Sequence, residues 1–297
     1  MSRKLPPLKE LVNVLEVEEA ARLKLAPELY EEIAGSDRRA FDRMTFRPRL
    51  MVNSMKLDLS VELFGEKLFA PILVGPVARL DRFHPEGQAA MARGAAAART
   101  LMVAADSGVP EKGPFWLQVN AGADVDSARG RAMDAVKAGC KAVCVGAAWD
   151  WNVFGRFRQG IGAPVLLKGI MTPEEARAAL EIGAQGIIVS SYRSGASDGL
   201  VSAIEALPAI VDAVAGRIPV LVDGSFRRGT DVLKALAFGA RAVMLARPVV
   251  WGLAAYGADG AQYVLELVRG ELARAMVMCG KVNLAQVDRG LVRIHRR

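Results

Sequence analysis

The sequence predicts a single (β/α)8 TIM barrel preceded by a short helical extension at the N-terminus. Eight short apolar runs alternate with segments of helical periodicity, a pattern typical of a parallel sheet. The runs are continuous rather than alternating, as expected for strands that are covered on both faces. In addition, residues 220–248 contain two successive strands that end in small residues and arginines. This combination suits a phosphate, which TIM barrels often bind after strands seven and eight.

The predicted strands are apolar runs that are each followed by a turn, a connector or a helical segment. In chain order they cover residues 71–77, 100–106, 115–120, 142–147, 164–170, 186–191, 219–225 and 242–248. The eight runs supply the full number of strands that a closed barrel of this class requires.

Capping residues mark the boundaries of the intervening helices. The expected helical segments are 85–99, 126–138, 149–160, 173–182, 200–214, one that opens near Gly229, and a long one over 250–278. Thr172 precedes Pro173 and two glutamates and is a natural N-cap. Glycines follow three of the helices, at Gly139, Gly183 and Gly239, where they permit the left-handed backbone of a helix end.

Length and composition agree with one barrel. We expect residues 1–56 to form the helical extension and the segment leading into the barrel, and residues 57–297 to form the barrel itself. Hydrophobic residues make up 52% of the 297, yet no run reaches the length of a membrane span. The N-terminus lacks the apolar core of a secretory signal, and the three cysteines lie in or beside apolar segments without metal-ligand spacing. These features predict buried thiols, no bound metal and a cytoplasmic location.

The net charge of +7 is compatible with anionic ligands. The arginines are scattered apart from the C-terminal tail, and no nucleic-acid-binding motif is present. We therefore interpret the charge as a solvated basic surface and expect no nucleic-acid partner.

Several segments in succession resemble the FMN-dependent α-hydroxy-acid dehydrogenase and oxidase family, which includes glycolate oxidase, lactate oxidase and mandelate dehydrogenase. The resemblance spans nearly the whole chain and is carried by residues 40–53, 57–78, 83–103, 164–190 and 217–240. It implies FMN bound at the C-terminal face of the barrel, with the phosphate on the loops after strands seven and eight. Because barrels of this family commonly form tetramers, it also implies a homo-oligomer, either dimer or tetramer.

The resemblance assigns the cofactor side of the site residue by residue. Lys168 matches the lysine that faces the flavin pyrimidine edge, and Gln118 matches a glutamine that bonds the ring. The other implied FMN contacts are Pro76, Val77, Ala78, Ser190, Asp223, Gly224, Ser225, Arg227, Ala246 and Arg247. Val77, Ser225 and Ala246 replace a threonine and two glycines of the family, and Gly146 replaces a threonine. A lost neutral hydrogen bond costs roughly 0.5–1.5 kcal/mol, so we expect weaker rather than abolished FMN binding.

The substrate side departs much further from the family. Tyr192 stands in place of the histidine base, Gly195 in place of the arginine that grips the substrate carboxylate, and Ala148 in place of the aspartate that orients the base. Glu32 and Asn120 replace two active-site tyrosines, and the connection after strand four is reduced to residues 149–161. Neither His84 nor His295 is placed to substitute for the base. A positioned base contributes roughly 10²–10⁴-fold to the rate, whereas an ordinary tyrosine, with a pKa of about 10, is almost entirely neutral at pH 7.

Two functional hypotheses follow. In the first, the chain is an FMN oxidoreductase with Lys168 and Tyr192 as catalytic residues and with a small-molecule or peptide-like substrate. Arg79 and Arg193 are then candidates for a relocated anion grip, and Glu32, Asn120 and Trp149 for further substrate contacts. In the second, the chain is an inactive FMN- or phosphate-binding scaffold that acts through a partner.

Overall fold

The barrel strands account for the eight apolar runs. The computed structural model describes residues 4–35, 37–49, 55–105, 114–120, 124–146, 150–191 and 201–295. Eight parallel strands close in sequence order, with the last pairing with the first. These strands are β4 (Ile72–Val74), β5 (Met102–Ala105), β6 (Phe115–Val119), β7 (Cys140–Gly146), β8 (Val165–Ile170), β9 (Gly186–Val189), β10 (Val220–Asp223) and β11 (Ala242–Leu245). The predicted (β/α)8 fold is therefore confirmed.

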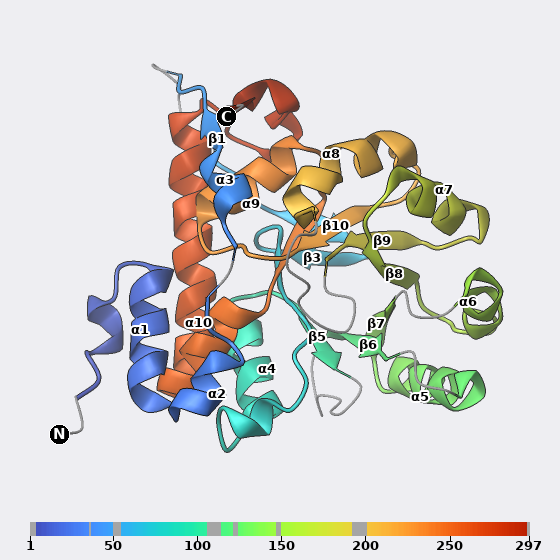
Figure 1. Ribbon diagram of the computed structural model, residues 1–297, viewed down its shortest axis with the longest axis horizontal. Coiled ribbons are helices and arrows are strands. Elements are labelled where there is room, and N and C mark those ends of the chain that lie inside the picture. The colour runs from blue at the N-terminus through green and yellow to red at the C-terminus, as the bar shows by residue number, and fades with distance from the viewer. Residues whose placement is uncertain are drawn as a thin grey trace.

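Helices surround the strands as the periodicity predicts (Figure 1). They are α4 (Gly87–Ala97), α5 (Val125–Lys137), α6 (Trp151–Phe157), α7 (Pro173–Glu181), α8 (Ala203–Val214), α9 (Gly229–Ala237) and α10 (Arg247–Met278). Thr172 accepts a hydrogen bond from the Glu175 backbone and completes a capping box. Gly139, Gly183 and Gly239 all have positive φ, so the predicted helix ends are confirmed.

The expected long helix from about residue 250 to 278 is confirmed as α10, with two differences. The helix α10 already begins at Arg247, directly after β11, and is interrupted at Gly257, where φ is 65° and ψ is −145°. The two parts meet so closely that a side-chain carbon on Gly252 would lie 2.3 Å from the Gly260 carbonyl oxygen. Apolar periodicity continues across the interruption, which hid it in the sequence.

The interior of the barrel is filled by side chains from the strands. Leu73, Trp116, Cys144, Leu166 and Ile188 belong to this inner cluster. A hairpin of β2 (Val61–Leu63) and β3 (Glu66–Leu68) adds apolar side chains to it, and the rings of Phe64 and Trp116 lie 5.6 Å apart. The hairpin therefore closes the end of the barrel at which the strands begin.

The N-terminal extension is helical, as expected, and packs on the barrel. It contains η1 (Leu8–Glu10), α1 (Val14–Lys24), α2 (Pro27–Glu31), α3 (Arg39–Asp42) and β1 (Met44–Phe46). Helix α1 lies beside α10, which also contacts α4 (Figure 1). Strand β1 pairs antiparallel with β12 (Val292–Ile294), near the other end of the chain. The extension thus shares its packing with the barrel, and the boundary near residue 57 stays a prediction.

Three short 3-10 helices complete the described elements: η2 (Leu80–Arg82), η3 (Leu284–Gln286) and η4 (Arg289–Leu291). All three cysteines are buried, as predicted. Among the described residues, none of the helices combines the length and apolar character needed to cross a membrane. The same residues contain no cluster of three or more metal-ligating side chains.

The close approach within α10 predicts that Gly252→Ala destabilises the protein. Helix propensity alone favours alanine over glycine by about 0.5–1 kcal/mol, but the added carbon would overlap the Gly260 carbonyl and cost about 1–3 kcal/mol. We expect Gly252→Ala to lower the free energy of unfolding measured in urea. Gly130→Ala, within α5 and with no atom near the added carbon, should raise it. Equal stabilisation by both substitutions would contradict the packing described here.

Candidate active site at the C-terminal face of the barrel

A buried lysine joins the ends of three neighbouring strands. The Lys168 ammonium, on β8, lies 2.7 Å from the Asp223 carboxylate at the end of β10 and 2.8 Å from the Ser190 hydroxyl after β9. Lys168 is only 5% exposed, and Asp223 is partly buried. A buried charge requires such partners, because desolvation otherwise makes the ionised form costly. The cluster places one ammonium group at the mouth of the barrel.

The strand register explains why these residues meet. Lys168 pairs with Ile188, and Val222 pairs with Val189, so Ser190 and Asp223 follow at the same level of the barrel. The register between β8 and β9 shifts between Lys168 and Ile170, where Gly169 has a φ of 102°. Irregularities of this kind redirect a side chain beside a functional site. The glycine thereby allows Lys168 to face its two partners.

Gln118 presents an unsatisfied acceptor at the same end of the barrel. Its Nε2 lies 3.5 Å from the Asn120 Oδ1, just beyond the end of β6. Its Oε1 is buried and receives no hydrogen bond from the part of the chain that the structure describes. Leaving a buried acceptor unpaired costs about 1–3 kcal/mol, so a ligand that donates a hydrogen bond to this oxygen would recover that energy.

Two arginines converge beyond the ends of β10 and β11. Arg227, which is 3% exposed, donates from Nη2 to the Gly35 carbonyl at 3.0 Å, and Arg247 donates from Nη1 to the same oxygen at 2.6 Å. The Arg227 guanidinium also lies 4.5 Å from the ring centroid of Trp251. Among the described residues, neither arginine forms an ion pair with a carboxylate. Two like charges therefore share one neutral acceptor.

The electrostatic consequence appears in the pKa values. Burial, with the Arg247 charge as the second cause, lowers the pKa of Arg227 to about 9. Burial likewise lowers the pKa of Arg247. Arg227 remains protonated at neutral pH, so an anion beside the two guanidinium groups would offset part of the cost of burying its charge.

The turns around the arginines keep glycine-like geometry despite the substitutions. Gly224 and Ser225 follow β10 with φ values of 106° and 59°. Ser225 thus holds a left-handed backbone that favours glycine, at a cost of about 1–2 kcal/mol. Ala246 follows β11, and its Cβ would lie 3.4 Å from a side-chain carbon on Gly75. Pro76, Val77 and Ala78 therefore leave β4 beside this turn, where Pro76 and Val77 are half-buried and Ala78 is exposed.

The expected substrate residues are only partly placed. The Glu32 carboxylate pairs with Arg82 of η2 at 2.5 Å, a partner that the sequence did not indicate. Arg79 is exposed and has a φ of 54°, and Asn120 is exposed beside Gln118. Tyr192, Arg193 and Trp149, with Ala148 and Gly195, lie outside the described residues.

Both histidines have other surroundings. A side-chain carbon on Gly257 would lie 3.1 Å from the His84 Nε2, which places this histidine against the interruption of α10. The His295 Nε2 lies 2.8 Å from the Thr45 hydroxyl, beside the β1–β12 pair. Neither position touches the Lys168 cluster.

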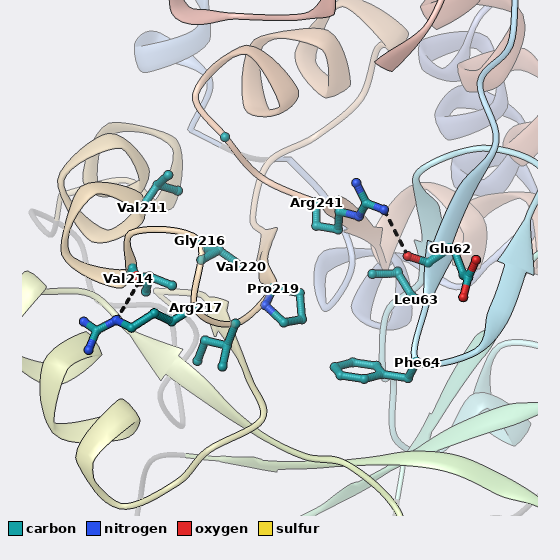
Figure 2. A pocket seen from close by; sticks show the side chains of 12 residues that line it. Glu62, Leu63, Phe64, Val211, Val214, Gly216, Arg217, Pro219, Val220 and Arg241 are labelled. Atoms are coloured by element: carbon teal, nitrogen blue, oxygen red, sulfur yellow. Dashed lines mark hydrogen bonds between the residues drawn. The ribbon is translucent and has the colours of Figure 1, made fainter. Parts of the chain in front are cut away.

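A separate groove of about 490 Å³ lies at the opposite end of the barrel (Figure 2). Its lining includes the hairpin residues Glu62 and Phe64 and the beginning of β10 at Pro219 and Val220. Figure 2 shows Arg241 directed to the Glu62 backbone, to whose carbonyl it donates at 3.4 Å. None of the predicted site residues lines this groove. Residues at this end of a TIM barrel generally serve stability rather than catalysis.

Comparisons with known proteins agree with this geometry. The family profile described as FMN-dependent dehydrogenase matches residues 30–147 and 145–294. Glycolate oxidase 1 of Oryza sativa subsp. indica is 32% identical over 350 residues, covering 94% of this chain and 95% of the relative. A peroxisomal (S)-2-hydroxy-acid oxidase of Oryza sativa subsp. japonica is 33% identical over 353 residues, with 95% of each chain covered.

Solved structures give the same result. Mandelate oxidase with (S)-2-phenylpropionate superposes with a TM-score of 0.91 at 32% identity, covering 97% of this chain and 100% of the other. A complex of mandelate oxidase with benzoyl-formic acid gives a TM-score of 0.90. From the profile match and these relatives, the chain belongs to the family of FMN-dependent dehydrogenases.

Proposed function

We propose that this protein is an FMN oxidoreductase that has kept the cofactor side of its family's site and changed the substrate side. The cofactor supplies, when bound, an acceptor for two electrons from an organic substrate. The observation that carries the proposal is the Lys168–Ser190–Asp223 cluster, which keeps a buried ammonium group at the barrel mouth. Lys168 stabilises negative charge at the pyrimidine edge of the ring, while Asp223 and Ser190 hold its ammonium in place.

The residues present fit FMN at three separate points. The paired charges of Arg227 and Arg247 suit a phosphate dianion, since neither has a described carboxylate as a partner. The unsatisfied Gln118 oxygen suits the single ring N–H of an oxidised flavin. The Lys168 ammonium suits the electron-rich carbonyl edge of the ring. The hydrogen-bond donors and acceptors at this face of the barrel thus match both the anionic phosphate and the polar ring edge of FMN.

The position at which this chain lacks residues of its relatives supports a changed substrate side. The alignment to glycolate oxidase 1 runs over 350 residues although this chain has 297, so the relative carries additional residues. The family profile is divided at residues 145–147, at the end of β7. This division coincides with the connection in which we expect the lid to be missing. It adjoins Ala148, which stands in place of the aspartate that orients the base.

The remaining groups favour a substrate larger than glycolate or lactate. Trp151 opens α6 after the shortened connection and keeps 39% of its surface exposed. We propose that Trp149 and Asn120 contact this substrate, that Arg79 or Arg193 grips an anionic group, and that Tyr192 acts as an acid or hydrogen-bond donor. Glu32 is already paired with Arg82, so we propose that it contributes to the charge around the open end of the barrel rather than contacting the substrate. A small-molecule or peptide-like substrate suits a barrel end with a shortened connection and an exposed tryptophan.

We expect small α-hydroxy acids not to reduce the bound flavin at a useful rate. The base and the carboxylate-binding arginine are both replaced, and the base alone is worth roughly 10²–10⁴-fold. Anaerobic mixing of the FMN-loaded protein with glycolate, L-lactate or (S)-mandelate should bleach the flavin at least about 100-fold more slowly than in rice glycolate oxidase measured in parallel.

Two variants and a colour test sharpen this experiment. Tyr192→His combined with Gly195→Arg should accelerate bleaching by glycolate, while Tyr192→His alone should do so less, because the carboxylate remains unbound. Fast bleaching by the unmodified protein would overturn the proposed change of substrate. A colourless protein that FMN cannot reconstitute would instead support the scaffold hypothesis.

Lys168→Met should lower the reduction potential of bound FMN. Loss of an ionic contact worth about 1.5–3 kcal/mol corresponds to about 30–60 mV for a two-electron couple. Spectroelectrochemical titration measures this shift. The control is Lys141→Met, at the start of β7, where the lysine pairs with Glu66 at the other end of the barrel. An unchanged potential in Lys168→Met, or an equal shift in the control, would contradict the role assigned to Lys168.

A further inference from the structure

A short segment of the N-terminal extension lies against both arginines. We call residues 33–35 and 37–38, between α2 and α3, the strap. Trp251 donates from Nε1 to the Ile33 carbonyl at 3.0 Å. Arg247 donates to the carbonyls of Ala34 and Gly35, and Arg227 donates to that of Gly35. Three barrel side chains thus bind three successive carbonyl groups of the strap.

The strap is anchored on both sides of these contacts. Within it, the Gly35 backbone N–H donates a hydrogen bond to the Glu18 carboxylate of α1 at 3.2 Å. At its C-terminal end, Arg38 binds both oxygens of the Asp231 carboxylate, at 2.9 and 3.1 Å, and donates to the Ser225 carbonyl at 2.8 Å. Asp231 is 1% exposed and also accepts from the backbone N–H groups of Arg227 and Arg228. Arg38 therefore ties the strap to the turn that carries Arg227.

These contacts hold two positively charged groups close together. Two guanidinium groups of like charge repel each other, so a shared acceptor favours an arrangement in which they lie close together. The Gly35 carbonyl takes one N–H from each group and holds the pair together. An arginine has five N–H donors, and the contacts with the strap occupy only one nitrogen of each guanidinium. The Arg227 Nη1 also donates to the Phe226 carbonyl at 2.9 Å. The N–H groups left on the two guanidinium groups can meet an anion in a preorganised arrangement, which lowers the entropic cost of binding.

We propose that the strap positions Arg227 and Arg247 for the FMN phosphate, and that the Arg38–Asp231 ion pair holds the strap in place. Gly35 and Arg38 are then positioning residues of the cofactor site, contributed by the extension rather than by the barrel. The inference rests on the proposed function, because it assumes that FMN occupies the C-terminal face.

Riboflavin separates this role from a general effect on folding, since it has the ring of FMN without the phosphate. We expect Arg38→Ala to weaken FMN binding about 10-fold, which corresponds to about 1.4 kcal/mol, and to leave riboflavin binding unchanged. Fluorescence titration of both ligands gives the ratio of their dissociation constants. Arg38→Lys, which keeps the charge but loses the fork, should give an intermediate ratio. The control is Arg39→Ala, whose exposed side chain pairs with Asp37.

Each outcome bears on one of the two proposals. If the unmodified protein binds FMN no more tightly than riboflavin, the phosphate site and the proposed function fail together. If it prefers FMN but Arg38→Ala keeps that preference, the strap has no part in phosphate binding. Equal weakening of both ligands, or the same change in Arg39→Ala, would reduce the strap to a structural role. Glu18→Gln, which weakens the other anchor, tests the proposal independently if Arg38→Ala does not fold.

Discussion

A buried guanidinium group, that of Arg227, and a half-buried one, that of Arg247, lie side by side at the mouth of this barrel, and their mutual repulsion limits what can surround them. Arg227 follows β10 and Arg247 follows β11, so the parallel pairing of these two strands brings the two charges together. Within the described residues they share a backbone carbonyl rather than a carboxylate. In the proposed function, the FMN phosphate offsets the repulsion between them. The N-terminal extension, the turn after β10 and the beginning of α10 all meet at this pair of guanidinium groups.

In the function we propose, the same constraint explains why the cofactor side is kept while the substrate side changes. The cofactor side depends on Lys168, Asp223 and the two arginines, which are held by strand register and by buried hydrogen bonds. Loss of Asp223 would leave the buried Lys168 ammonium without its carboxylate partner, at a cost of several kcal/mol. The substrate side is built on connections after the strands, where length and side chains vary at little cost to the core. The shortened connection after β7 and the replaced base that we propose both fall in this second group.

Much of the fold was predictable because it depends on local signals. Continuous apolar runs marked the barrel strands, and Thr172 and Gly183 marked helix ends through their capping chemistry. The interruption of α10 at Gly257 was missed, since apolar periodicity continues through it. Resemblance to a family named Lys168 and Arg247 but could not reveal that Arg38 ties the extension to Asp231. That contact joins residues far apart in the chain and lacks a local signal.

Electron density from crystals grown with FMN would show directly which groups hold the cofactor. We expect phosphate density against Arg227 and Arg247, and ring density beside Gln118 and Lys168, at the C-terminal face of the barrel. The Gly35 carbonyl should remain bonded to both arginines in that complex. Density for the phosphate elsewhere, or an empty barrel mouth in crystals saturated with FMN, would contradict the assignment of this face as the cofactor site.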